Sequence, residues 1–210
     1  MSITLRDTDV LLAVDVQNDF LPGGRLAVPD GDAVVPVINR LAPMFHNVVL
    51  TQDWHTEGHA SFASAHRARR PFDIVELSYG RQVLWPDHCV RGTPGADFAP
   101  GLTIPQAQLV IRKGYHPSVD SYSAFVEADG ATCTGLAGYL RERGIKRVFL
   151  AGLATDYCVA FSALDALAAG FEALVIEDAC RGIDLAGSLA AAWARMDRAG
   201  VRRTSTEEIG

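Results

Sequence analysis

A carboxylate, an ammonium group and a thiol each follow a predicted strand of this sequence. Asp15 comes directly after the apolar run VLLAV, Lys113 follows QLVIR, and Cys158 lies one tight turn after RVFLAG. The carboxyl ends of parallel strands meet at one edge of an α/β sheet, where ligands bind. Taken singly, Asp15 could cap a turn, Lys113 could be a surface charge, and Cys158 could be a small apolar core residue. Together at one edge, the three indicate a catalytic group.

Nucleophilic attack by sulfur is the chemistry that this group could perform. A free thiol is mostly protonated, and a nearby cation or a helix N-terminus stabilises its thiolate. We expect Lys113 and the first turn of a helix beginning near Thr155 or Asp156 to do so for Cys158. Asp15 would accept the thiol proton and pass it to a departing nitrogen, while Lys113 keeps the carboxylate ionised.

A second cluster of side chains is typical of a metal site. Asp53 and His55, in the segment DWH, occupy alternate positions of an extended segment, so both point to the same side. His59 and His88 lie nearby in sequence or across the following loop. A carboxylate with imidazoles suits zinc, iron(II) or manganese. An isolated histidine is more often hydrogen-bonded on the surface or in the core, but this combination favours a metal.

Short β-rich runs alternate with helical patterns, which is typical of a parallel sheet with helices on its faces. Strands are predicted at 10–14, 47–52, 108–112, 147–152 and 172–177, with a weaker sixth at 201–204, and helices at 32–45, 132–143, 156–169 and 185–199. Gly144, Gly170 and Gly200 fall where helix C-caps belong. The proline-rich stretch 55–105 shows little periodicity, so we expect an extended functional loop region there. Residues 1–210 should form a single domain.

Composition excludes several classes of partner. The chain has 210 residues, a formal net charge of -6 at pH 7 and no long basic run, so neither nucleic acid nor a membrane surface is expected. The first apolar run is too short to span a membrane and has no signal-peptide cleavage pattern, which predicts a cytoplasmic protein. The four cysteines form no CxxC pair and should be free thiols.

Five linked motifs resemble those of the nicotinamidase/pyrazinamidase family, in the order in which the family has them. They are DVQNDFLPGG (15–24), TQDWHTEGHASFAS (51–64), LWPDHCVRGTPGADF (84–98), IRKGYHPSVDSYSAF (111–125) and GLATDYCVAFSALDA (152–166). The likeness continues through EDACRGID and the final helix, so it covers nearly the whole chain. One departure is Thr56, where DWHP is common in the family.

The resemblance implies an isochorismatase-like fold, with three layers and a mainly parallel sheet of about six strands. It implies a catalytic triad of Asp15, Lys113 and Cys158, which agrees with the argument from strand ends. It also implies one divalent metal ion, zinc, iron or manganese. The implied ligands are Asp53, His55 and His88, and His59 sits where some members have a further ligand.

The remaining site residues are also implied by the resemblance. Phe20 and Trp85 match aromatic positions that sandwich a pyridine ring, although core packing is a competing role for both. Leu153 and Tyr157 would be further substrate contacts. The Leu153 to Ala154 segment resembles the cis peptide of the family, and the N–H groups of Ala154 and Cys158 would form the oxyanion hole.

The predicted reaction is hydrolysis of nicotinamide to nicotinic acid and ammonia through a thioester on Cys158, in NAD salvage, with pyrazinamide as a further substrate. A different amidase or N-carbamoyl hydrolase with the same triad is the nearest alternative. A non-catalytic binding protein is a second alternative, which the complete triad disfavours. A redox-sensing thiol protein is a third, but no resolving cysteine lies beside Cys158. The partner is a small carboxamide, and a homo-oligomer is possible.

Overall fold

Six segments of the chain pair side by side into one sheet. The strands are β1 (Asp9–Val14), β2 (Asn47–Asp53), β5 (Leu109–Lys113), β6 (Arg147–Leu153), β7 (Glu172–Arg181) and β8 (Arg202–Thr204). Their order is β5-β2-β1-β6-β7-β8, and every neighbouring pair is parallel. This computed structural model describes residues 2–210. The predicted six-stranded parallel sheet is confirmed, and β7 continues beyond its predicted end to Arg181.

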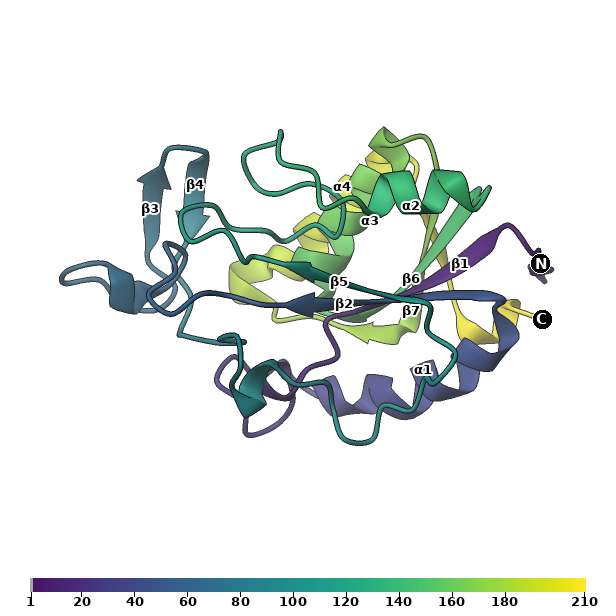
Figure 1. Ribbon diagram of the computed structural model, residues 1–210, viewed down its shortest axis with the longest axis horizontal. Helices are drawn as coiled ribbons and strands as arrows, with labels where there is room; N and C mark the ends of the chain where they lie inside the picture. Colours follow the sequence, from purple (N-terminus) through teal and green to yellow (C-terminus); the bar gives the residue numbers. More distant parts are fainter. Residues whose placement is uncertain (1) are drawn as a thin grey trace.

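Helices cover both faces of this sheet (Figure 1). Leu11 and Ala13 of β1 belong to one apolar cluster, which contains α1 (Val34–Leu41). Val10, Leu12 and Val14 belong to the other, which contains α2 (Leu136–Glu142), α3 (Ala160–Ala168) and α4 (Ser188–Ala199). Successive strand residues point to opposite faces, so both faces of β1 are buried. The predicted three-layer arrangement is therefore confirmed.

The helices are shorter than their sequence patterns predicted. The segment 132–135 lies outside α2, where Cys133 forms an antiparallel bridge with Val126. The first turn of the helix predicted at 156–169 is a π-helical turn, Thr155–Val159, and α3 begins only at Ala160. Gly200 caps α4 in the left-handed conformation, as its position predicted.

The long stretch 55–105 is tied to the end of the sheet where β2 finishes. Besides two short 3-10 helices, its described residues form a hairpin of β3 (Ile74–Leu77) and β4 (Gly80–Val83), which the expectation of an irregular loop missed. Figure 1 shows this hairpin at the end of the molecule away from both termini. Isolated bridges join His55 to Val90 and Phe62 to Trp85. The stretch therefore folds back beside the residues that follow β2.

The strand order places a switch point between β1 and β6. The connection after β1 runs through α1 on one face, and the connection after β6 runs through α3 on the other face. Ligands of such sheets bind at the carboxyl ends of the strands beside this point. Gly152 has a φ of 123°, and a Cβ there would lie 2.1 Å from the carbonyl oxygen of Val14. Because residue 152 is a glycine, β6 can pack closely against Val14, the residue that precedes Asp15.

The structure also bears on the predictions about membrane spans and cysteines. Within residues 2–210, no helix is long and apolar enough to cross a membrane. Cys89, Cys133, Cys158 and Cys180 are all free, as predicted.

A buried ion pair joins the starts of β1 and β6. Asp9 and Arg147 are register partners, and they are 1% and 5% exposed. Arg147 Nε donates to Asp9 Oδ1 at 2.7 Å, and its Nη2 also donates to the carbonyl oxygen of Thr4 at 2.8 Å. A slip of one residue would separate these charges, so the pair helps to hold the register of the two strands.

We predict that Arg147→Met lowers the free energy of unfolding by roughly 3 to 5 kcal/mol, because it leaves Asp9 buried without its partner. Urea denaturation of the purified variant measures this loss. The control is Arg203→Met, which removes an ion pair to Glu177. The side chains of Arg203 and Glu177 are 45% and 46% exposed. That change should cost below about 1 kcal/mol. Equal losses in the two variants would contradict the assigned role of Arg147.

Candidate active site and metal centre

Asp15 is the first residue after β1 and is fully buried. Its φ of 48° lies in the left-handed region, which is uncommon outside glycine and occurs often at functional sites. Thr51, at the same edge of the sheet, donates from Oγ1 to Asp15 Oδ1 at 2.5 Å and accepts from the Asp15 backbone N–H at 3.1 Å. The backbone turn and Thr51 together hold this carboxylate in one orientation.

The ammonium group of Lys113 lies at the centre of the site and is fully buried. Its Nζ is 2.9 Å from Asp15 Oδ2 and 3.4 Å from Cys158 Sγ, and it pairs closely with Asp53 Oδ1. It also donates to the carbonyl oxygen of Ser121 at 3.0 Å. Burial alone would lower the pKa of Lys113, but Asp15 and Asp53 raise it well above its ordinary value. Lys113 is therefore a permanent cation.

Cys158 lies in the π-helical turn, close to both carboxylates. Burial raises the pKa of the Cys158 thiol well above its ordinary value. Lys113 opposes this rise, while the charges of Asp15 and Asp53 and a hydrogen bond to Asp15 add to it. Lys113 favours a thiolate, as expected, but burial and the charges of Asp15 and Asp53 outweigh it, so the net shift of the Cys158 pKa is upward. The resting group is a protonated thiol beside a carboxylate.

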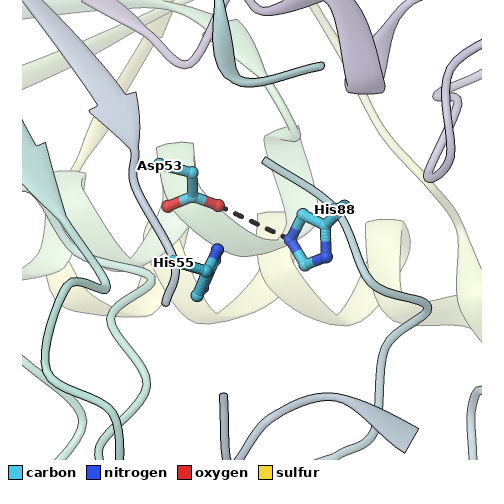
Figure 2. Close-up of side chains that lie close together, drawn as sticks. All are labelled: Asp53, His55 and His88. Carbon is cyan, nitrogen blue, oxygen red and sulfur yellow. Dashed lines mark ion pairs between the residues drawn. The ribbon is translucent and has the colours of Figure 1, made fainter. Parts of the chain in front are cut away.

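Asp53, His55 and His88 turn towards a common space (Figure 2). One atom of each that could bind a metal lies within 4.8 Å of the others, and all three residues are buried. His88 Nδ1 lies 2.8 Å from the carbonyl oxygen of Pro86, which can only accept, so Nδ1 carries the proton. His88 Nε2 lies 3.6 Å from Asp53 Oδ2. A metal ion between these two atoms would bind both of them, in the place that a proton on Nε2 would otherwise take.

His55 completes this set with an unused nitrogen. Its Nε2 lies 3.3 Å from Asp120 Oδ1, whereas its Nδ1 is buried without a hydrogen-bond partner. Burial would lower the pKa of His55, but Asp53 and Asp120 raise it. Three donor atoms of types that bind divalent metals are thus held together, and one is otherwise unsatisfied. The residues fit a metal ion.

His59, the further candidate ligand, has both ring nitrogens occupied. Its Nδ1 lies 2.7 Å from Ser61 Oγ, and its Nε2 lies 2.8 Å from the carbonyl oxygen of His116. The carbonyl fixes the proton on Nε2, and Ser61 then donates to Nδ1. His59 has no free lone pair in this arrangement.

Asp120 is a buried residue of the site that the sequence reasoning did not single out. Burial would raise the pKa of Asp120, but the hydrogen bond from His55 and the charges of His55 and His59 together outweigh it and lower the pKa to about 2. Asp120 stands inside the motif IRKGYHPSVDSYSAF, yet no spacing there sets it apart from its neighbours.

A narrow cavity is lined by Cys158 and by the three metal-binding candidates, Asp53, His55 and His88. Its walls include Phe20, Trp85 and Tyr157, as the resemblance implied, together with Leu26, Asp120, Tyr122, Ala154 and Ile183. The Trp85 and Tyr157 rings meet edge to face, with centroids 4.8 Å apart. Leu153 is fully buried in the core and does not line this cavity. A contact between Leu153 and the substrate stays a prediction from the resemblance.

The turn before Cys158 has the expected backbone form. The peptide bond between Leu153 and Ala154 is cis. Ala154 lines the cavity beside Cys158. The backbone thus brings both predicted oxyanion-hole residues to the same wall.

Known proteins resemble this chain in both fold and sequence. The isochorismatase domain family matches residues 9–208. A nicotinamidase of Acinetobacter baylyi is 56% identical over 199 residues, which is 95% of this chain and 93% of that protein. The solved nicotinamidase/pyrazinamidase of Acinetobacter baumannii is 58% identical with a TM-score of 0.96, over 97% of this chain and 98% of that one. A solved pyrazinamidase of Pyrococcus horikoshii in complex with zinc is 37% identical with a TM-score of 0.78, over 94% and 99% of the two chains. The chain therefore belongs to the isochorismatase domain family.

Proposed function

We propose that this chain is a metal-containing nicotinamidase, an amidohydrolase that converts nicotinamide to nicotinic acid and ammonia in NAD salvage and also acts on pyrazinamide. The observation that carries the proposal is the meeting of Asp15, Lys113 and Cys158 beside an aromatic cavity. The high identity to named nicotinamidases supports the same reaction.

In the proposed first half-reaction, Cys158 Sγ attacks the carboxamide carbon while Asp15 accepts the thiol proton. The N–H groups of Ala154 and Cys158 stabilise the oxyanion that forms. Asp15 then gives its proton to the nitrogen, the C–N bond breaks, and ammonia leaves a thioester on Cys158.

In the second half-reaction, Asp15 accepts a proton from water as the water oxygen attacks the thioester carbon. The C–S bond breaks, the sulfur recovers a proton, and nicotinic acid is released. Lys113 holds Asp15 in place throughout, since its ammonium contacts both the carboxylate and the sulfur. Asp15 therefore serves as base and acid in turn.

Asp53, His55 and His88 would hold one divalent ion, and the zinc complex of the Pyrococcus pyrazinamidase supports zinc, with iron and manganese suited to the same ligands. Such an ion would supply a Lewis acid that orients the pyridine nitrogen of the substrate. We assign His59 to hydrogen bonding within its loop instead of to the ion, because Ser61 and His116 occupy its nitrogens.

Phe20, Trp85 and Tyr157 would contact the pyridine ring. The cavity that they line holds only about 20 Å³, which is room for a single water molecule. Ring binding therefore requires the wall to open. Tyr157 is the partly buried member of these three.

The chain would act as one domain over residues 1–210. Its four free cysteines agree with a reducing compartment, and we propose the cytoplasm. A homo-oligomer is compatible with this assignment.

Cys158→Ala should lower nicotinamide turnover by at least about 1,000-fold, because it removes the nucleophile. Ammonia release from nicotinamide measures the rate. The matched control is Cys133→Ala, which removes an exposed free cysteine and should leave the rate unchanged. Near wild-type ammonia release by the Cys158 variant would exclude a thioester mechanism.

His88→Ala should lose the metal ion, since it removes one of three protein ligands. After incubation with zinc and removal of excess ion, the wild-type chain should retain about one zinc per chain and the variant nearly none by elemental analysis. His46→Ala is the control, because His46 is exposed and pairs only with Asp7. A full zinc complement in the His88 variant would place the ion elsewhere.

The pH profile of kcat/KM should have an acidic limb set by Asp15. Burial raises the pKa of Asp15, with Lys113 opposing this effect, and the base works only when ionised. Activity should therefore fall as the pH drops through a value above the ordinary aspartate pKa of about 3.9. Zinc content is measured at each pH, because protonated histidines release metal. An acidic limb at or below about pH 3.9, with zinc retained, would contradict this role.

A further inference from the structure

We infer that Asp120 is a positioning residue for the metal site: it fixes the proton of His55 on Nε2 and so presents His55 Nδ1 to the ion. This inference rests on the proposed metal site at Asp53, His55 and His88. Asp120 itself would not touch the ion.

The surroundings of His55 distinguish its two nitrogens. Nε2 lies 3.3 Å from Asp120 Oδ1, and it also faces the backbone of Gly114, where an added Cβ would lie 2.8 Å from it. Asp120 is thus the hydrogen-bond partner on that side of the ring, where a side chain at position 114 would not fit. Nδ1 is buried and has no partner. An ion therefore has space and a lone pair only at Nδ1.

Asp120 is held in a single orientation by two other donors. The backbone N–H of Ser121 donates to Oδ1 at 2.9 Å, and Gln82 Nε2 lies 2.8 Å from Oδ2. Asp120 and Gln82 are 2% and 1% exposed, so water does not compete for these bonds. A carboxylate held in this way can only accept, so the proton shared with His55 belongs to Nε2.

Asp120 also lies within reach of His55 and His59, which raises the alternative that these three bind a second ion. The hydrogen bonds argue against it. Ser61 and the carbonyl of His116 occupy both nitrogens of His59, and Asp120 already accepts from protein donors at each oxygen. Metal-ligating histidines commonly donate their other N–H to a carboxylate, and that is the arrangement of His55 and Asp120.

The same contacts connect the metal site to the cavity wall. Gln82 Nε2 lies 2.9 Å from the hydroxyl oxygen of Tyr122, which accepts from Trp85 Nε1 at 3.0 Å. Asp120 is thus one end of a buried polar chain that reaches Trp85. We expect a change at Asp120 to alter metal affinity first, because His55 is its direct partner.

The test uses the full chain with Asp120→Ala and Asp120→Asn. Zinc affinity, measured by competition with a chelator, should fall about 100-fold in the alanine variant and about 10-fold in the asparagine variant, which keeps an acceptor for His55. Nitrogen-15 NMR of the metal-free wild-type protein should show His55 protonated on Nε2. The alanine variant should show a mixture of the two tautomers.

Glu127→Gln is the matched control. Glu127 is a buried carboxylate from the same part of the chain, 3% exposed, and among the described residues no hydrogen bond or ion pair joins its side chain to Asp53, His55 or His88. The zinc affinity of the Glu127→Gln variant should stay within about twofold of the wild type. Only side chains that hydrogen-bond to a metal ligand are expected to tune metal affinity, and Glu127 is not one of them.

The outcomes separate this inference from the proposed function. Unchanged zinc affinity in both Asp120 variants would overturn the inference, as would reduced affinity with an unchanged His55 tautomer, which would indicate a merely structural role. If the alanine variant does not fold, the tenfold change in the asparagine variant carries the test. If the wild type binds no zinc, the proposed metal site is wrong, while a His55 proton on Nδ1 would refute the role of Asp120 independently.

Discussion

The buried charge of Lys113 stabilises two clusters at once. Its ammonium contacts Asp15 and Cys158 on the catalytic side and Asp53 on the metal side. Burying the charges of Lys113, Asp15 and Asp53 is costly unless each has a close partner. None of these three groups therefore tolerates loss of its neighbours. One cation against two carboxylates leaves an excess negative charge in this buried group. A divalent ion at Asp53 would offset that excess, which is a physical reason for the two clusters to adjoin.

The sheet sets the geometry of these charges. Asp53 and Lys113 are register partners at the ends of β2 and β5, and Val14 pairs with Gly152 where β1 meets β6. Side chains alternate between faces, so a slip of one residue would turn Lys113 away from both carboxylates. The precision of the site therefore depends on strand register, and the two loop residues, Asp15 and Cys158, are placed by the strands that precede them.

The parts of the site that could be predicted from sequence follow from this dependence. Apolar runs mark strands, and the polar residues after them must share one edge, which was enough to predict that Asp15, Lys113 and Cys158 meet. The hairpin at β3 and β4 was missed because its strands are short and carry no strong apolar pattern. Asp120 was missed because its role depends on hydrogen bonds from Gln82 and Ser121, which no local spacing reveals.

The raised pKa of Cys158 was the least predictable property, because it depends on how many buried acids surround the sulfur. Lys113 alone would favour a thiolate, whereas burial together with Asp15 and Asp53 keeps the proton on the thiol. Positive charge bound at Asp53 would weaken one of the effects that hold this proton. A metal ion at the proposed site would therefore ease loss of the Cys158 proton through the electrostatics of the shared carboxylate.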